Sequence, residues 1–427
     1  MNEDYMKLKD FAQKRLNDSC KNGNDYDVRY WVGYIDGLNA LHKKMDKTVT
    51  RSGTPIKLLI GGSPCTKWSI AQKNGREVLP EGIGWELFEN YRIAKEKFQP
   101  DIFLYENNKS AAQPIKDAIY SALGGGKDLS VRLTHINSAL VSAQHRERFY
   151  VTNFGDIEQP KDRGILLRTV LETDRATDQF NYYRLESVVP INTTADGKAR
   201  TVKAQYHHSS MANFVTNGGY PATAVATPIR IGTIESNVEN KSHDSKQYRV
   251  YSPDGKATTL CGQGGGVGAK TGLYACPINE IDGKPIYTVK NGLITIKNKQ
   301  YPIKLADGYY LIRKLTPTEC ERLQTMPDGY TAAVSNSQRY RALGNGWTAE
   351  VIIHILNHAF KDVPRDKELV VLSMYDGIAT GRYCLDKMGF TNVKYYAYEI
   401  DPYAQKIAMS NYPDIIQCGD AFQIRNF

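Results

Sequence analysis

The sequence lacks any long apolar run. No stretch approaches the roughly 18 consecutive apolar residues of a membrane-spanning helix, and the polar start MNEDYMKLKD has no apolar core like that of a signal peptide. These absences exclude an integral membrane protein and predict a protein of the cytoplasm. The 427 residues, 41% hydrophobic and 24% charged, are typical of a soluble globular chain with two or three domains.

Cysteine is sparse and irregularly placed. The count of seven is odd and no two cysteines form a CxxC pair, which argues against both a disulfide framework and the usual zinc sites. We therefore expect reduced thiols and no metal. The positions are Cys20, Cys65, Cys261, Cys276, Cys320, Cys384 and Cys418.

Acidic residues are fewer than basic ones, 46 against 55, which gives a formal net charge of +9 and a pI near 8.9. Lysines and arginines that neutralise phosphates release counterions and supply affinity for nucleic acid that does not depend on sequence. Many unrelated proteins are equally basic. The charge therefore permits a polyanionic partner without identifying one.

Strands and helices alternate between about residues 56 and 153. This alternation is typical of a parallel sheet with helices on its faces. The predicted strands are 57–61, 101–105, 131–138 and 147–153, and the predicted helices are about 85–97 and 112–123.

The region from 161 to 310 has a different composition and residue pattern. It is rich in Gly, Thr, Tyr and short β-like runs and shows no helical periodicity, so it predicts a separate, mostly β domain. Two similar stretches within it, 196–205 and 254–263, favour a pair of related hairpins over chance.

Helical patterns flank these blocks. Residues 311–360 are predicted to be helical, beginning with a capping box from Thr316 to Glu319 that has Pro317 at the first helical position. Residues 1–50 are predicted to form an N-terminal helical segment that packs against the rest, and the sequence indicates no function for it.

The final block, 366–427, has the pattern of an adenosyl-binding site. A strand at 369–374 leads into a glycine turn, a second strand ends before Glu399, and a third ends before Asp420. Glycines let the backbone approach a ligand closely, and an acid after the second strand accepts hydrogen bonds from ribose hydroxyls.

Cys65 follows directly on the apolar strand 57–61, in the stretch GGSPCTKWS. Open α/β sheets keep their chemistry at the carboxyl ends of strands, so a nucleophile would be placed there. An ordinary buried thiol is the alternative, because free cysteine is among the most buried residue types.

Six motifs decide between these interpretations. They are SPC at 63–65, YENN at 105–108, QHRER at 144–148, RKLTPTECERLQTMPDGY at 313–330, RALGNGW at 341–347, and the terminal set SMYDGIATG, YEID and GD. Together they resemble the motifs of the C5-cytosine DNA methyltransferases, both animal de novo enzymes and bacterial or phage members. The resemblance implies an α/β fold: a Rossmann-like class I methyltransferase sheet with an inserted, mostly β target recognition domain.

One departure from that family is large, because the cofactor motifs lie at the carboxyl end. The chain is therefore expected to be circularly permuted, which is tolerated where the cut falls in an exposed connection. The expected domains are the helical segment 1–50, the catalytic half of the methyltransferase domain at 51–160, the target recognition domain at 161–310, return helices at 311–365, and the S-adenosylmethionine-binding half at 366–427.

The resemblance also implies roles for the motif residues. Cys65 adds to C6 of a flipped-out cytosine, while Glu106 grips the N3 side of the base and supplies a proton. Arg146 and Arg148 alternate along a strand and so face the same way, towards the base and its phosphate. The residues expected to shape the nucleophile turn or to contact DNA are Ser63, Pro64, Gln144, Thr259 and Leu260.

The implied cofactor is S-adenosyl-L-methionine, with S-adenosyl-L-homocysteine as the product. The residues expected to bind it are Tyr375, Asp376, Gly377, Ile378, Gly381, Glu399, Ile400 and Asp420, with Asn345 and Trp347 closing the methionine end. The implied partner is double-stranded DNA of a target sequence that the residues do not indicate. We expect a monomer in the cytoplasm of a bacterial or phage-infected cell.

Two alternatives stay open at this point. One is an RNA cytosine methyltransferase on the same scaffold, which a large groove-reading middle domain argues against. The other is a catalytically weak, DNA-binding regulatory relative, which would be expected to have lost Cys65, Glu106 or the cofactor acids. The biological role is equally open, between self-protection of a phage or plasmid genome and partnership with a restriction endonuclease.

Overall fold

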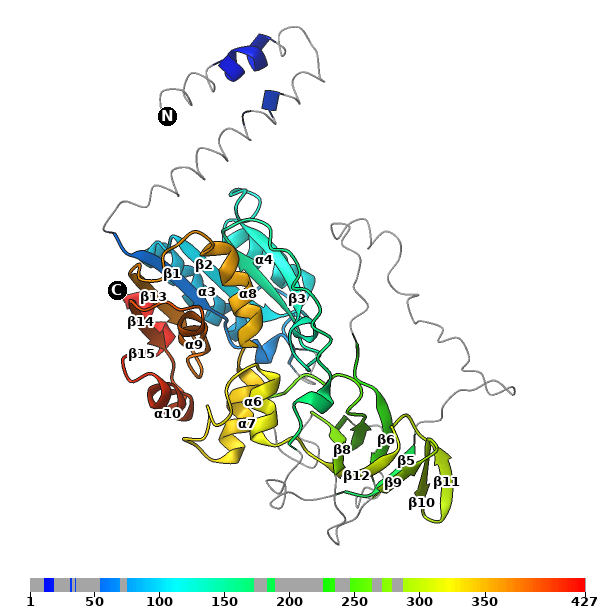
Figure 1. The fold of residues 1–427 in the computed structure, drawn as a ribbon. Helices are drawn as coiled ribbons and strands as arrows, with labels where there is room; N and C mark the ends of the chain where they lie inside the picture. The colour runs from blue at the N-terminus through cyan, green and yellow to red at the C-terminus, as the bar shows by residue number, and fades with distance from the viewer. Residues whose placement is uncertain are drawn as a thin grey trace.

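Two β-sheets organise the chain (Figure 1). The structure is a computed structural model that describes residues 11–18, 31–32, 35, 54–69, 75–172, 183–188, 226–234, 246–262, 271–278 and 287–426. Residues 11–18 are helical, and most of the predicted helical segment 1–50 lies outside the described residues.

The larger sheet has seven strands in the order β15-β14-β13-β1-β2-β4-β3. β1 pairs in parallel with β13 and β2, whereas β4 is antiparallel to both of its neighbours. The bounds are β1 Ile56–Gly61, β2 Ile102–Asn108, β3 Arg132–Asn137, β4 Glu147–Thr152, β13 Leu369–Met374, β14 Val393–Tyr398 and β15 Ile416–Gly419.

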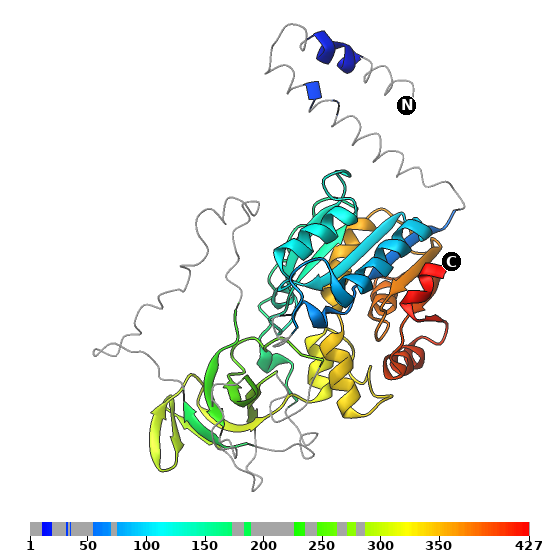
Figure 2. The same ribbon diagram turned by 180° about the vertical axis from the view of Figure 1, so that it is seen from behind.

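Helices cover both faces of this sheet (Figures 1 and 2). The central strand β1 is apolar and buried on both sides, as is typical of a parallel strand between two helical layers. One layer consists of α3 (Gly82–Phe98) and α4 (Gln113–Ala122). The other includes α8 (Ala349–Ala359), α9 (Thr380–Lys387) and α10 (Pro402–Asn411).

The last sixty or so residues of the chain complete the sheet from its middle outwards. β13 runs beside β1, with Ile56 opposite Leu369 and Gly61 opposite Met374. Strands β14 and β15 then extend the sheet to its edge. The predicted class I methyltransferase sheet in permuted chain order is confirmed by this strand arrangement.

The smaller sheet has eight strands in the order β11-β10-β9-β12-β8-β7-β6-β5, and all its pairs except β7 with β8 are antiparallel. Over the residues that the structure describes, its strands agree with the predicted β character of the middle of the chain. Their bounds are β5 Leu185–Val188, β6 Arg230–Ile234, β7 Arg249–Tyr251, β8 Leu273–Ile278, β9 Tyr287–Lys290, β10 Leu293–Ile296, β11 Lys299–Pro302 and β12 Gly308–Arg313.

Two local predictions need correction. Residues 311–313 are not helical but end β12, an inner strand of the smaller sheet whose apolar residues pack in its core. Residues 254–262 form no hairpin, only an isolated bridge between Ala257 and Gln144, and their partner stretch 196–205 lies outside the described residues.

The capping box is confirmed. Thr316 precedes α6 (Pro317–Leu323), and its side chain accepts a hydrogen bond from the Glu319 amide. In return, the Thr316 amide donates to the Glu319 carboxylate. Glu319 also forms a fully buried, two-bonded ion pair with Arg313, the last residue of β12. The smaller sheet is therefore joined rigidly to the helices that follow it, α6, α7 (Asn336–Asn345) and α8.

Residues 252–262, which we call the strap, run from the smaller sheet into the larger domain. The fully buried Lys256 donates from Nζ to the carbonyls of Ala139, Ser142 and Ile165. Ala257 exchanges backbone bonds with the segment that precedes β4. The strap thereby places Leu260 beside the catalytic half of the chain.

Candidate active site

One cavity of about 500 Å³ lies where β1, β2, β13, β14 and β15 end. It brings together residues that the sequence places far apart, from the nucleophile turn to the cofactor acids. The predicted residues that line it are Ser63, Pro64, Cys65, Glu106, Arg146, Arg148, Asn345, Trp347, Tyr375, Asp376, Gly377, Ile378, Glu399, Ile400 and Asp420.

Cys65 begins a short 3-10 helix, η1 (Cys65–Lys67), immediately after the turn that leaves β1. The turn passes so close to β2 that a Cβ on Gly62 would lie 2.5 Å from the Glu106 carbonyl oxygen. Only glycine permits that approach. This turn therefore brings the Cys65 thiol into the lining of the cavity, together with Glu106.

A buried hydrogen-bond network fixes this turn. Asn107 donates from Nδ2 to the Ser63 carbonyl at 3.0 Å and to the Tyr105 hydroxyl at 2.9 Å. The Tyr105 and Ser63 hydroxyls lie 2.8 Å apart and share a hydrogen bond. Asn107 and Tyr105 alternate on one face of β2, so the strand itself holds the residues that precede Cys65.

Burial raises the pKa of the Cys65 thiol. The positive charges of Arg148 and Arg146 oppose this rise, and the Glu106 carboxylate adds to it. The free protein therefore holds Cys65 mainly as the thiol, with two arginines positioned to stabilise the thiolate when it forms.

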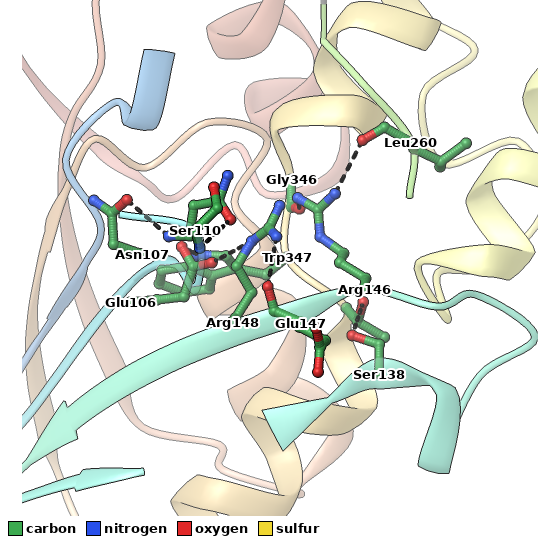
Figure 3. Close-up of polar contacts among 12 residues, drawn as sticks. Glu106, Asn107, Ser110, Ser138, Arg146, Glu147, Arg148, Leu260, Gly346 and Trp347 are labelled. Carbon is green, nitrogen blue, oxygen red and sulfur yellow. Dashed lines mark hydrogen bonds and ion pairs between the residues drawn. The ribbon is translucent and has the colours of Figure 1, made fainter. Parts of the chain in front are cut away.

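Glu106 receives a donor at each carboxylate oxygen (Figure 3). Arg148 Nε lies 2.9 Å from Oε1, and the Trp347 indole N–H donates to Oε2 at 3.0 Å. The charged pair is close to fully buried, with side-chain exposures of 10% for Arg148 and 12% for Glu106. This carboxylate is consequently held in one orientation.

Arg146 lines the same cavity but its guanidinium is occupied differently (Figure 3). Nη1 donates to the Leu260 carbonyl, and Nη2 donates to the carbonyls of Gly344 and Gly346. Burial lowers the pKa of Arg146 to about 10, and the neighbouring Arg148 charge adds to that effect. Arg146 therefore joins the strap to the turn between α7 and α8.

The cofactor side is built on the turn after β13. Tyr375, Gly377 and Ala379 have φ of 60°, 67° and 61°, so this turn curls through the left-handed region. The Glu399 carboxylate accepts backbone N–H bonds from Gly377, Ile400 and Asp401. Burial raises the pKa of Glu399, although these three donors oppose the rise.

This donor and acceptor set fits an adenosyl group. The curled turn exposes backbone close to the ligand position, while Glu399 and Asp420 offer carboxylate oxygens from neighbouring strand ends, as ribose and adenine donors require. The Tyr375 ring is fixed because its hydroxyl donates to the Leu87 carbonyl and receives a bond from Asn90.

Four predicted residues do not line the cavity. Gly381 packs its helix against β1, because a Cβ there would lie 2.3 Å from Ile60 Cδ1. Thr259 donates its hydroxyl to the His145 carbonyl, and Leu260 is buried in the core. Gln144 is fully buried, and neither of its amide atoms has a hydrogen-bond partner among the described residues.

Sequence reasoning did not identify the contact of Trp347 with Glu106, the supporting role of Asn107, or Lys256. The side chain of Asn108, the last residue of β2, also lines the cavity. A motif shows that Asn107 and Asn108 follow Glu106, but only the neighbouring turn shows what their amides contact.

The strand order is that of a class I methyltransferase sheet, and the candidate site lies at the carboxyl ends of its strands. A sequence model described as C-5 cytosine-specific DNA methylase matches residues 39–361, and the chain belongs to that family. Its activity is accordingly that of a DNA cytosine-5 methyltransferase, which uses S-adenosylmethionine. The matched region ends before β13, so the cofactor strands lie beyond it.

Several relatives are similar to this chain. The type II methyltransferase M.HhaI of Haemophilus parahaemolyticus is 24% identical over 304 residues, 70% of this chain and 73% of that protein. The orphan methyltransferase M.SPBetaI of Bacillus phage SPbeta is 31% identical over 155 residues, 30% of this chain and 32% of that protein. A solved methyltransferase from Entamoeba histolytica, at 12% identity and a TM-score of 0.40, covers 72% of this chain and 78% of its own.

Among the residues that the structure describes, none of the helices has the length and apolar character needed to cross a membrane.

Proposed function

We propose that the protein methylates C5 of a flipped-out cytosine in a specific duplex DNA sequence through a covalent adduct with Cys65. The observation that carries this proposal is the single cavity in which Cys65, Glu106 and the cofactor turn meet. Cytosine C5 is a poor nucleophile, so the ring needs activation before it can accept a methyl group.

The residues divide this chemistry between them. The Cys65 thiolate forms a bond to C6, while a proton shared with Glu106 at N3 accommodates the electron density that the ring receives. Arg148 stabilises both anionic partners, since it contacts Glu106 and opposes the raised pKa of Cys65. After C5 has accepted the methyl group, loss of the C5 proton restores the double bond and releases Cys65.

S-adenosylmethionine, when bound, supplies an electrophilic methyl group and leaves as S-adenosylhomocysteine. Glu399 would accept hydrogen bonds from the ribose hydroxyls and Asp420 one from the adenine amine, while Tyr375 would pack against the adenine. Asn345 and Trp347, which line the same cavity, would close it at the methionine end. We propose that no metal takes part.

Recognition of the target sequence is proposed to lie in the smaller sheet, within residues 161–310, with Thr259 and Leu260 as candidate contacts. The strap supports this assignment, because Lys256 and Arg146 tie it to the larger domain, while the Thr258 amide donates to the Tyr274 hydroxyl on β8 of the smaller sheet. We further propose a monomer that acts on double-stranded DNA in the cytoplasm of a bacterial or phage-infected cell.

The test is sequencing of 5-methylcytosine in DNA and RNA from a host that expresses the protein, with Cys65→Ala as the matched control. We expect methylation at one DNA motif in the wild-type host and none in the variant. Methylation confined to RNA would establish the RNA alternative, and its absence from both would favour the regulatory one.

A further inference from the structure

Trp347 contributes more to the site than a wall. It lies in the turn between α7 and α8, yet its indole N–H donates to Glu106 Oε2, whereas the closest Arg148 contact is at Oε1. Figure 3 shows the three side chains converging from three separate segments. Indole nitrogen can only donate, so the contact favours Glu106 in its charged form.

The indole cannot easily swing away, because the backbone on both sides of it is fixed. The Gly346 carbonyl accepts bonds from Arg146 at 2.8 Å and from Gln324 at 3.2 Å. On the other side, the Thr348 hydroxyl donates to the Gln324 side chain at 2.8 Å. The indole N–H of Trp347 is therefore held in position to donate to Glu106.

The same turn lies close to the turn after β13. A Cβ added to Gly346 would lie 3.8 Å from Ile378 Cδ1. The backbone beside the indole is thus bonded to Arg146, which also contacts the strap, and lies near the cofactor turn.

We propose that Trp347 is a positioning residue for Glu106, which orients the carboxylate and sets the pH at which it can share a proton with the target base. This inference rests on the proposed function. A hydrogen bond to the charged form of a carboxyl favours that form. Removing the indole donor should let Glu106 keep its proton to higher pH.

The test is the pH profile of single-turnover methylation by Trp347→Phe, which keeps an aromatic wall but has no N–H. We expect its alkaline limb to move upward by roughly one pH unit, as the loss of one hydrogen bond to a charged group implies. Trp85→Phe is the matched control, since Trp85 packs on Phe88 in α3 and does not line the cavity. Its profile should match that of the wild type.

Two further measurements separate the possible results. In a Glu106→Gln background, covalent capture on 5-fluorocytosine DNA is measured across the same pH range. There, Trp347→Phe should leave the pH profile unchanged. An unmoved alkaline limb in Trp347→Phe, with weaker S-adenosylmethionine binding by calorimetry, would overturn the inference and leave Trp347 as a cofactor wall. A wild-type protein that methylates no DNA would instead overturn the proposed function, and this inference with it.

Discussion

Glu399 and Glu106 line the same cavity, and the chain holds these two carboxylates by different means. Glu399 accepts three backbone N–H bonds from the turn and strand end around it. Glu106 is held by two side chains, Arg148 and Trp347, that come from distant segments. The cofactor side is organised by backbone donors, and the catalytic side by side-chain donors.

This difference has consequences for mutation. Backbone donors survive any substitution that leaves the turn intact, so the cofactor side should lose affinity in modest steps. Side-chain donors vanish with a single substitution, so the catalytic side should lose activity sharply.

The largest effect is expected at Cys65. Cys65→Ala should abolish methylation, because Cys65 is the one cysteine among the described residues that line the cavity, while S-adenosylmethionine binding should be unchanged. The measurement is a denaturing gel with duplex DNA that carries 5-fluorocytosine, in which fluorine blocks the elimination that releases the enzyme. A shifted band of equal strength for the variant would rule out the Cys65 adduct.

Arg148→Ala should rank second. The substitution leaves a nearly buried carboxylate without its charged partner, which costs about 2–5 kcal/mol and corresponds to a loss of roughly 30- to 5,000-fold in methylation rate. Single-turnover rates at saturating cofactor measure it. The control is Arg132→Ala, which removes an exposed ion pair with Asp156 and should have little effect. Comparable losses in both variants would show that the buried pair has no special role.

Glu399→Ala and Asp420→Ala should have a moderate effect, confined to the cofactor. Each is expected to weaken S-adenosylmethionine binding by about 1–3 kcal/mol through lost charged hydrogen bonds, with the fold intact. Calorimetry measures the affinity, and Asp414→Ala, at an exposed pair with Arg382, is the control. Wild-type affinity in both test variants would contradict the cofactor assignment.

The last expected effect, at Asp376, is on the free energy of unfolding and depends on pH. Its Oδ1 accepts bonds from Ser373 and Tyr395, while Oδ2 has no partner among the described residues. Burial raises the pKa of Asp376 from 3.8 to about 6. Because the folded state then binds the proton more tightly than the unfolded state, stability falls as pH rises through this interval.

Asp376→Asn should accordingly raise the free energy of unfolding by about 1–3 kcal/mol near pH 8, with the gain disappearing towards about pH 4. Urea denaturation across this range measures it, with Asp362→Asn on the exposed link after α8 as the control. A gain that does not change with pH would mean that the Asp376 charge is not its source.

Local features of the fold were predictable, and features that depend on distant neighbours were not. The apolar run of β1 and the capping box at Thr316 follow from residues adjacent in sequence. Residues 311–313 were mistaken for helix because the apolar run that ends β12 is short and has no clear period.

The site shows the same division. Motifs identify the residues that meet in the cavity, but the alternation of Arg146 and Arg148 cannot reveal that Arg146 donates to Leu260, Gly344 and Gly346. Those carbonyls come from the strap, from the last turn of α7 and from the residue after it, and only the folded chain places them together. For the same reason, the sequence does not predict the three carbonyls to which Lys256 donates.

The pairing of β1 with β13 also determines when the larger sheet can form during synthesis. Ribosomes deliver the chain from its N-terminus at roughly 5–20 residues per second, and domains fold as they emerge. β1, at residues 56–61, emerges early, whereas its neighbour β13, at residues 369–374, emerges only after all strands of the smaller sheet. A nascent chain therefore carries Cys65 well before it carries Glu399 and Asp420, so the cavity that these residues share cannot form until β13, β14 and β15 have emerged.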